Sequence, residues 1–242
     1  MLRVLVLMLV VLLTAVQGTV AGPELTISEK LFDFGYVPQN SKVSHVFWLH
    51  NTGDQDLKIT KVTPGCGCTQ APLDKQVVPP GDSARLEIIF STRLYFNNVS
   101  KSPLIECDGM EKPTAVTVAT YVIPRPDSAR PLVLEPFKLD ISQYGSEVRD
   151  RATFTITNVT DKELSLSAIT DVSALGVLNL AKRVGPRETV EASLVLKPEV
   201  LGTELTESFT FQVSDSVKTR YTVPVRRRLK DPRVGEMIAP GE

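Results

Sequence analysis

One pattern of alternating apolar and polar residues occurs twice in this chain, about 107 residues apart. Phe47–Asn51 matches Phe154–Asn158, and the apolar positions that follow also correspond. The later pairs are Leu57 with Leu164, Ile59 with Leu166, Val78 with Val184, Pro80 with Pro186, Ala84 with Val190, Leu86 with Ala192, Ile88 with Leu194 and Phe90 with Leu196. A repeat of this length, written in period-two alternation, predicts two copies of one β domain.

Short apolar runs bounded by turn residues continue through both copies. The 14 Gly and 17 Pro are spread along the chain between these runs, and no amphipathic helical stretch of convincing length interrupts them. Several short strands at regular spacing are typical of an antiparallel β-sandwich. We therefore expect an all-β fold of two tandem sandwiches, each of about 100 residues.

The N-terminus has the pattern of a secretory signal peptide. Arg3 precedes the apolar run Val4–Val16, and small residues follow at positions 18–22. The run is shorter than the roughly 20 residues that a spanning helix needs. We expect cleavage after Gly18 or Ala21 and a soluble periplasmic or secreted protein, while an uncleaved N-terminal anchor is the alternative.

These features divide the chain into five parts. Three prolines within eight residues predict an extended, semi-stiff connection between the copies. The expected parts are a signal peptide (1–21), a first sandwich (22–123), a Pro-rich linker (124–131), a second sandwich (132–229) and a flexible tail (230–242).

Charge and motif content argue against several classes of function. The 27 basic and 28 acidic residues give a net charge of −1, which supplies no general field to attract nucleic acid or an anionic membrane. The chain has two His, no Gly-x-Ser-x-Gly elbow, no Gly-rich phosphate loop and no His-Glu-x-x-His motif. We therefore expect a protein that is not an enzyme and that carries no cofactor.

The three cysteines carry the only distinctive chemistry in the sequence. Cys66, Cys68 and Cys107 allow three pairings, each of which leaves one thiol free, and the sequence does not choose among them. A structural disulfide is the preferred interpretation, and Gly67 is expected to supply the backbone angles of a small Cys66–Cys68 ring. The alternatives are a redox-active pair and a Cu(I) site at Cys66 and Cys68, with Cys107 or His45 as a third ligand.

Trp48 and His45 are the candidate interaction residues. His45 shares a strand face with Phe47 and is expected to be packed and hydrogen-bonded, whereas Trp48 lies on the opposite face. Trp48 is either an exposed anchor for a partner or, as we prefer, is covered by the other copy or a later strand. The basic run Arg226–Arg228 is interpreted as a solvated strand end rather than a partner site.

Six motifs occur in a fixed order within residues 25–92. They are Phe32-Asp33-Phe34-Gly35, His45-Val46-Phe47, Asn51-Thr52-Gly53, Leu57-Lys58-Ile59, Cys66-Gly67-Cys68-Thr69 and Pro80-Gly81. Together they resemble the bacterial domain of unknown function 1573 family. The resemblance implies an exported protein with an immunoglobulin-like sandwich of the MSP/hydin type, and it implies no established reaction. The second copy has no Cys, its equivalent positions being near Ser173 and Leu175.

Two hypotheses for function follow. The first is an exported, non-enzymatic structural or protein-interaction module of the cell envelope, which presents loops and sheet edges to an envelope or extracellular protein. The second is a thiol-based redox or Cu(I)-binding protein that uses Cys66 and Cys68.

Overall fold

The structure is a computed structural model that describes residues 22–230. The predicted signal peptide (1–21) and residues 231–242 of the predicted tail lie outside the described residues. Lys230, which we assigned to the tail, instead ends the last strand. Apart from the short 3-10 helices η1 (Pro126–Ser128) and η2 (Pro198–Val200), the regular elements of the described chain are strands, so the expected all-β fold is confirmed.

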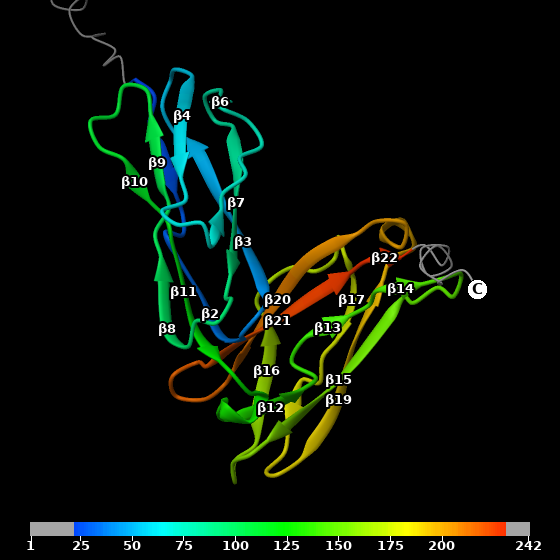
Figure 1. The fold of residues 1–242 in the computed structure, drawn as a ribbon. Helices are drawn as coiled ribbons and strands as arrows, with labels where there is room; N and C mark the ends of the chain where they lie inside the picture. Colours follow the sequence, from blue (N-terminus) through cyan, green and yellow to red (C-terminus); the bar gives the residue numbers. More distant parts are fainter. Residues whose placement is uncertain (1–21, 231–242) are drawn as a thin grey trace, which may run out of the picture.

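The strands are short and follow one another through brief turns (Figure 1). They are β1 (Leu25–Ile27), β2 (Leu31–Pro38), β3 (Lys42–Asn51), β4 (Leu57–Thr63), β5 (Thr69–Gln70), β6 (Val77–Val78), β7 (Ser83–Ser91), β8 (Asn97–Lys101), β9 (Leu104–Cys107), β10 (Thr114–Ala115), β11 (Thr117–Ile123), β12 (Leu132–Glu135), β13 (Leu139–Asp140), β14 (Gln143–Tyr144), β15 (Arg151–Asn158), β16 (Leu164–Ala168), β17 (Gly176–Asn179), β18 (Arg183–Val184), β19 (Thr189–Leu196), β20 (Leu205–Val213), β21 (Arg220–Arg227) and β22 (Leu229–Lys230).

The first sandwich uses strands β1 to β11. One layer has the order β1-β3-β7-β5, and the other contains β10-β9-β4-β6 together with β2, β11 and β8. Side chains from both layers form one buried cluster, which includes Phe34, Phe47, Leu86 and Ile105. Strict alternation along β7 places Ala84, Leu86, Ile88 and Phe90 in this core, as the sequence pattern predicts.

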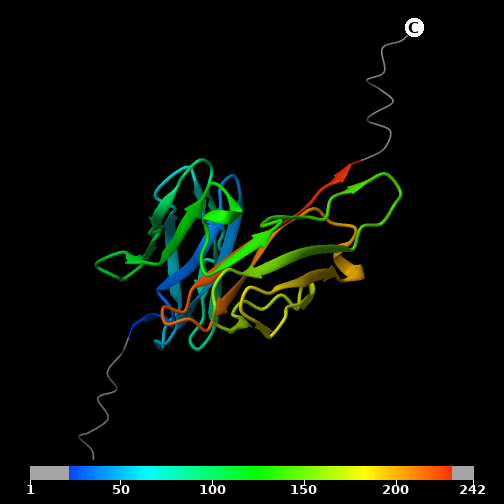
Figure 2. The ribbon, with the colours of Figure 1, turned by 90° about the horizontal axis from the view of Figure 1, so that it is seen from below.

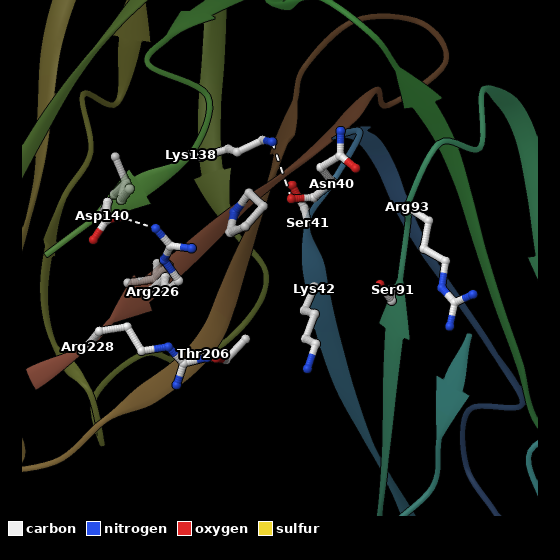
Figure 3. Close-up of a pocket in the computed structure, with 13 residues that line it drawn as sticks. Asn40, Ser41, Lys42, Ser91, Arg93, Lys138, Asp140, Thr206, Arg226 and Arg228 are labelled. Carbon is white, nitrogen blue, oxygen red and sulfur yellow. Dashed lines mark hydrogen bonds and ion pairs between the residues drawn. The ribbon is translucent and has the colours of Figure 1, made fainter. Parts of the chain in front are cut away.

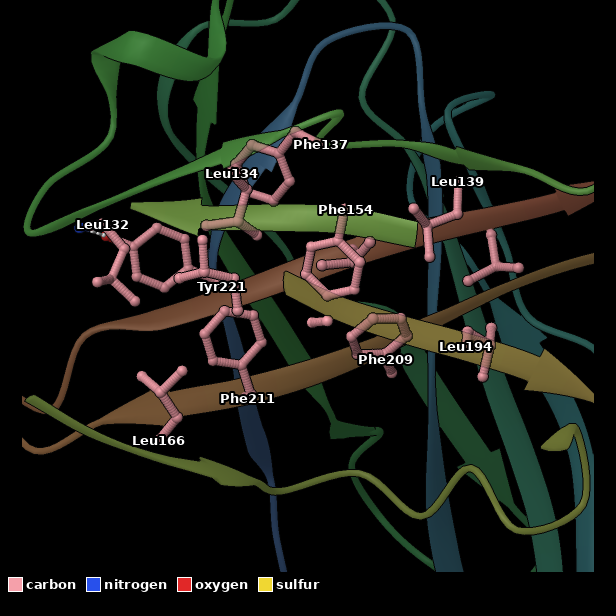
Figure 4. Packing of buried hydrophobic residues seen from close by; sticks show 14 of the residues in the cluster. Leu132, Leu134, Phe137, Leu139, Phe154, Leu166, Leu194, Phe209, Phe211 and Tyr221 are labelled. Carbon is pink, nitrogen blue, oxygen red and sulfur yellow. Dashed lines mark hydrogen bonds between the residues drawn. The ribbon is translucent and has the colours of Figure 1, made fainter. Parts of the chain in front are cut away.

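The second sandwich packs β12-β15-β19-β17 against β18-β16-β20-β21. Figure 4 shows Phe154 and Leu194 of the first layer facing Phe209, Phe211 and Tyr221 of the second. The rings of Phe211 and Tyr221 stack with their centroids 5.4 Å apart. The buried Tyr221 hydroxyl accepts a hydrogen bond of 2.8 Å from the Leu132 backbone N–H, so this polar group is satisfied inside the core.

The two copies share strand register as well as sequence pattern. In the first, β3 pairs with β7 so that Phe47 lies opposite Leu86. In the second, β15 pairs with β19 so that Phe154 lies opposite Ala192. These are the same positions that correspond in the sequence, and the structure thus bears out the internal repeat.

A buried Asn holds the same turn in each copy. The Asn51 side chain donates to the backbone carbonyls of Gln55 (2.7 Å) and Val78 (2.8 Å). Asn158 likewise donates to Lys162 (2.7 Å) and Gly185 (2.8 Å). Because each amide satisfies carbonyls of two separate segments, it fixes the turn after its strand against the turn that precedes the next long strand.

The two sandwiches share one sheet. β2 of the first sandwich lies beside β21 of the second, where Tyr36 pairs with Tyr221 in parallel (Figures 1 and 2). The Phe32-Asp33-Phe34-Gly35 motif stands at this junction, where β2 has a bulge relative to β11. At the bulge, side chains donate hydrogen bonds to backbone carbonyls that leave the strand pairing. Arg220 donates to the carbonyl of Asp33, Thr222 to that of Phe34 and Thr120 to that of Gly35. The motif therefore joins the sandwiches through its backbone.

The connection between the copies is not the extended linker that we expected. Its prolines begin the 3-10 turn η1 at Pro126, and the following Ala129 is fully buried in the second core. Ile123, at the end of β11, belongs to that same core. Proline fixes φ at a value that also suits the first residues of a 3-10 turn, so proline content alone did not distinguish a spacer from a packed turn.

The interpretation of Arg226–Arg228 as a solvated strand end is wrong for Arg227, whereas Arg226 is exposed and Arg228 partly exposed. Alternation along β21 turns Arg227 inward, where it is fully buried. Its guanidinium donates to the backbone carbonyls of Ile141 (2.8 Å), Arg149 (2.6 Å) and Leu201 (2.6 Å), and to the side-chain oxygen of Gln143 (2.8 Å). Arg227 therefore ties together three segments at the end of the second sandwich.

Candidate functional site

A groove of about 690 Å³ runs between the two sandwiches. Trp48 and Val46 of β3 line one wall, and Leu175 and Leu205 of the second sandwich line the other. Trp48 keeps 49% of its surface exposed, so the expectation that a later strand or the other copy covers it is wrong. Strand alternation explains this position, because Phe47 and Leu49 on either side of Trp48 point into the core.

Unpaired backbone lines this groove on both sides. β3 pairs with β7 along its length, but β1 reaches only Leu49, His50 and Asn51 on the other edge. In β20, the partner β16 reaches only Phe211, Gln212 and Val213. Within the described chain, no strand pairs with the earlier residues of β3 and β20 on those edges. The Ser208 hydroxyl crosses between them, accepting a hydrogen bond of 3.1 Å from the Ser44 N–H and donating one of 3.5 Å to the Ser44 carbonyl.

His45 is packed against aromatic rings, as we expected. Its ring stacks on Phe32 at 3.7 Å and meets Phe47 edge to face at 4.8 Å, while Glu29 Oε2 lies 3.4 Å from Nε2. Burial, followed by the positive charge of Arg220, lowers the pKa of His45 to about 4, and the half-exposed Glu29 carboxylate does not offset this. His45 is therefore neutral near pH 7 and serves as a flat packing surface at the edge of the groove.

The Cys66-Gly67-Cys68 segment forms a tight loop between β4 and β5. The structure places the two sulfur atoms 2.04 Å apart, as in a disulfide bond, and leaves Cys107 unpaired and buried. Gly67 does not have a positive φ, and a Cβ added there would meet no atom within 4 Å. The expectation that this loop needs glycine at its centre is therefore wrong, and Gly65, with φ of +85°, makes the left-handed turn instead.

Two side chains that the sequence analysis did not single out approach this loop. Arg93 donates to the Gly67 carbonyl (2.9 Å), and the Tyr95 hydroxyl lies 3.6 Å from the Cys68 sulfur. Both follow β7, about 25 residues further along the chain, and their place beside the cysteines depends on the pairing of β5 with β7. Leu94 and Phe96 next to them are 74% and 66% exposed, so the loop adjoins an apolar surface.

The residues proposed as a Cu(I) site do not gather in the structure. Among residues 22–230, no group of three or more His, Cys, Asp and Glu side chains is placed to hold a metal ion. Cys66 and Cys68 bond to each other in the structure, and burial raises the pKa of the Cys107 thiol. Cys107 is consequently a poor source of thiolate at neutral pH.

The described residues contain no helix that is long and apolar enough to cross a membrane. No curated protein is similar enough to this chain to count as a relative. A protein of unknown function from Porphyromonas gingivalis W83 aligns over 85% of this chain and 99% of its own, at 14% identity and a TM-score of 0.34. The CupB2 chaperone of Pseudomonas aeruginosa aligns over 82% and 98%, at 13% identity and a TM-score of 0.29.

A human PapD-like domain, domain 7 of CEP192, aligns over 41% of this chain and 85% of its own, at 12% identity and a TM-score of 0.32. The family model covers the first sandwich but not the second. It matches the segment that carries the six motifs, and residues 25–122 are therefore identified with the family described as Protein of unknown function (DUF1573).

Proposed function

We propose that this chain is an exported, non-enzymatic module that binds a protein partner in the groove between its two sandwiches. The predicted signal peptide supports the exported location. The observation that carries the proposal is the place of Trp48, whose indole is half exposed beside an unpaired stretch of β3. Exposed Trp side chains are frequent anchors of protein interfaces.

The strand edges around the groove give the mode of binding. Unpaired N–H and C=O groups attract another strand, and β-strand addition is a common way to bind an extended peptide. In this mode the backbone of β3 supplies the hydrogen bonds, and Trp48 supplies apolar contact. Arg85 and Glu87, which form an ion pair of 3.2 Å on the groove wall, select among partners by charge.

Site-specific photo-crosslinking in envelope extract tests this proposal. A photoreactive residue at Trp48 is expected to capture one defined protein, whereas the same residue at Val177, which is 58% exposed on β17, is not. Trp48→Ala should reduce recovery of that protein on the purified chain, and Val177→Ala should leave it unchanged. Equal recovery with both variants, in folded protein, would contradict binding at the groove.

The surroundings of the cysteine loop favour a second candidate function, thiol–disulfide exchange at Cys66 and Cys68. The Tyr95 hydroxyl lies 3.6 Å from the Cys68 sulfur, where it can donate to a thiolate, and Arg93 brings a positive charge to the Gly67 carbonyl of the same loop. In such an exchange a partner dithiol is oxidised to a disulfide while the Cys66–Cys68 bond is reduced to two thiols, and the two protons pass from the partner thiols. A Cys68→Ser variant keeps the half-buried Cys66 thiol, which can attack the disulfide of the oxidised partner in the reverse of this step and should be trapped with it as a mixed disulfide through Cys66. Failure to trap any partner would count against this candidate.

A further inference from the structure

A second hollow, of about 650 Å³, lies between the sandwiches. Thr206 lines this cavity, while its neighbours Leu205 and Glu207 line the groove that contains Trp48. The two hollows have no lining residue in common. The cavity is therefore distinct from the groove, although both are built at the same junction.

The cavity concentrates positive charge in a chain whose net charge is −1. Five cationic side chains line it, with a single carboxylate among them: Lys42, Arg93, Lys138, Arg226 and Arg228, with Asp140. Arg226 and Arg228 face the cavity because the intervening Arg227 points into the core. Figure 3 shows that both sandwiches contribute cations, with Lys42 and Arg93 on one side and Lys138, Arg226 and Arg228 on the other.

Internal partners neutralise only part of this charge. Arg226 pairs with Asp140, and Arg228 pairs with Glu204 at 2.9 Å. Lys138 donates to the Asn40 carbonyl (3.3 Å), which carries no charge, and partial burial together with the nearby Arg226 lowers the pKa of Lys138. No ion pair of Lys42 is present in the part of the chain that the structure describes. Anionic groups are therefore still attracted to the cavity.

The arrangement of the cations indicates the shape of the ligand. A site for a single oxoanion directs its donors to one point, whereas these side chains are spread across the cavity from Arg93 to Arg228 (Figure 3). A cavity of this volume also admits a ligand of many atoms. An extended chain with several carboxylates can meet cations on both walls at once.

We propose that this cavity binds an acidic peptide segment of a protein partner, with Glu or Asp carboxylates against Lys42 and Lys138, beside the paired Arg226 and Arg228. The inference deepens the proposed function, on which it rests, because it assigns a chemical class to part of the partner. Electrostatic complementarity of this kind contributes mainly to specificity and association rate, and salt screens it.

Fluorescence anisotropy with a labelled hexaglutamate peptide tests the inference on the purified chain. We expect saturable binding that weakens as salt is raised, with no binding of a hexaglutamine peptide. Lys42→Glu should weaken binding by about fivefold, as expected for a partly exposed charge pair. Lys58→Glu makes the same change of charge on an exposed side chain of β4 outside the cavity, and it should leave the affinity unchanged.

Two results would overturn the inference. One is equal loss of affinity in the Lys42 and Lys58 variants, which means a general charge effect. The other is displacement of the peptide by inorganic phosphate at matched ionic strength, which means a site for a small anion. If either result occurs while a photoreactive residue at Trp48 still captures a partner, the acidic-peptide proposal is contradicted, but binding of a partner in the groove is not. If the peptide binds as expected but the photoreactive residue at Trp48 captures nothing, only the proposal that a partner binds in the groove is contradicted.

Discussion

Gly35 lies so close to Arg220 that a Cβ added to the glycine would stand 2.1 Å from the Arg220 backbone oxygen. Gly35 also has φ of +64°, a conformation that other L-residues adopt only with strain. Arg220 in turn donates to the Asp33 carbonyl and lies 5.6 Å from the centre of the Phe32 ring. The last residue of the Phe-Asp-Phe-Gly motif thus allows the second sandwich to approach the first.

Gly35→Ala should therefore destabilise the protein by about 3 kcal/mol or more, because the new methyl group must displace backbone and hold a left-handed conformation. Urea unfolding measures the loss. Gly67→Ala is the control, since Gly67 has open space around it and no positive φ, and it should change stability by less than about 1 kcal/mol. Similar stability of the two variants would show that the sandwiches do not need this close approach.

The repeated Asn residues give a paired test of the duplicated fold. Asn51→Ala and Asn158→Ala each leave buried backbone carbonyls without a donor, so each should cost about 2–3 kcal/mol. The double variant should lose close to the sum, because the two sites lie in different sandwiches. Asn98→Ala, at an exposed position on β8, should be neutral within about 0.5 kcal/mol in the same unfolding measurement. A neutral Asn158→Ala would mean that the two turns are not equivalent.

The low pKa of His45 in the folded chain leads us to expect a loss of stability in mild acid. Its pKa is about 4 in the folded chain and about 6.5 when unfolded, so the unfolded state takes up the proton first as the pH falls. The stabilisation is complete above pH 6.5 and is lost as the pH falls toward 4. The free energy of unfolding should drop by about 2 kcal/mol between pH 7 and pH 4.5 from this group.

Replacement of His45 checks the assignment. His45→Leu should remove most of that drop, whereas His50→Gln, which keeps His45, should retain it. Urea titrations at both pH values provide the measurement. Glu29 opposes the effect, because its carboxylate lies 3.4 Å from Nε2 and favours the protonated ring. A Glu29→Gln variant is therefore expected to steepen the dependence, and an unchanged slope in His45→Leu would assign the dependence to other groups.

Lys should not be able to replace Arg at the buried position 227, although both side chains are positively charged. Arg227→Lys keeps the charge but provides three donors in place of five, and the lost donors leave carbonyls of separate segments unpaired. We expect a loss of about 3 kcal/mol in thermal or urea unfolding. Arg226→Lys on the exposed face should cost less than about 1 kcal/mol, because its ion pair with Asp140 is half exposed. Equal effects would mean that the Arg227 hydrogen bonds add little.

The sequence predicted those parts of the fold that depend on local periodicity. Alternation identified the core face of β3 and its counterpart in β15, and it placed Trp48 on the opposite face. It did not show whether anything covers Trp48, because cover depends on how the sandwiches meet. That meeting depends on the bulge at Gly35 and on side chains of β21 almost 190 residues away, which leave no local period.

The surroundings of the candidate sites were hidden for a related reason. Arg93 approaches the cysteine loop, and Lys42 and Arg228 share a cavity, only after strands distant in sequence have paired. The composition gives a nearly neutral net charge. A net charge summed over the whole chain cannot show that five cationic side chains line one cavity. One signal was available: in a strand with the pattern of Arg226–Arg228, alternation requires that the middle residue and its neighbours face opposite ways.

The cysteines give the last prediction, which separates the three pairings. If Cys66 bonds Cys68, native protein should contain one free thiol, that of Cys107, and this thiol should react slowly with alkylating reagents because it is buried and its pKa is raised. Denaturant without reductant should expose one thiol, and mild reductant on the native protein should add two, because the half-buried Cys66 gives the reductant access to the bridge although Cys68 is buried. Mass mapping after alkylation identifies the sites. A Cys107→Ala variant should keep the bridge and show no free thiol, whereas alkylation of Cys66 or Cys68 in unreduced native protein would place Cys107 in the bridge instead.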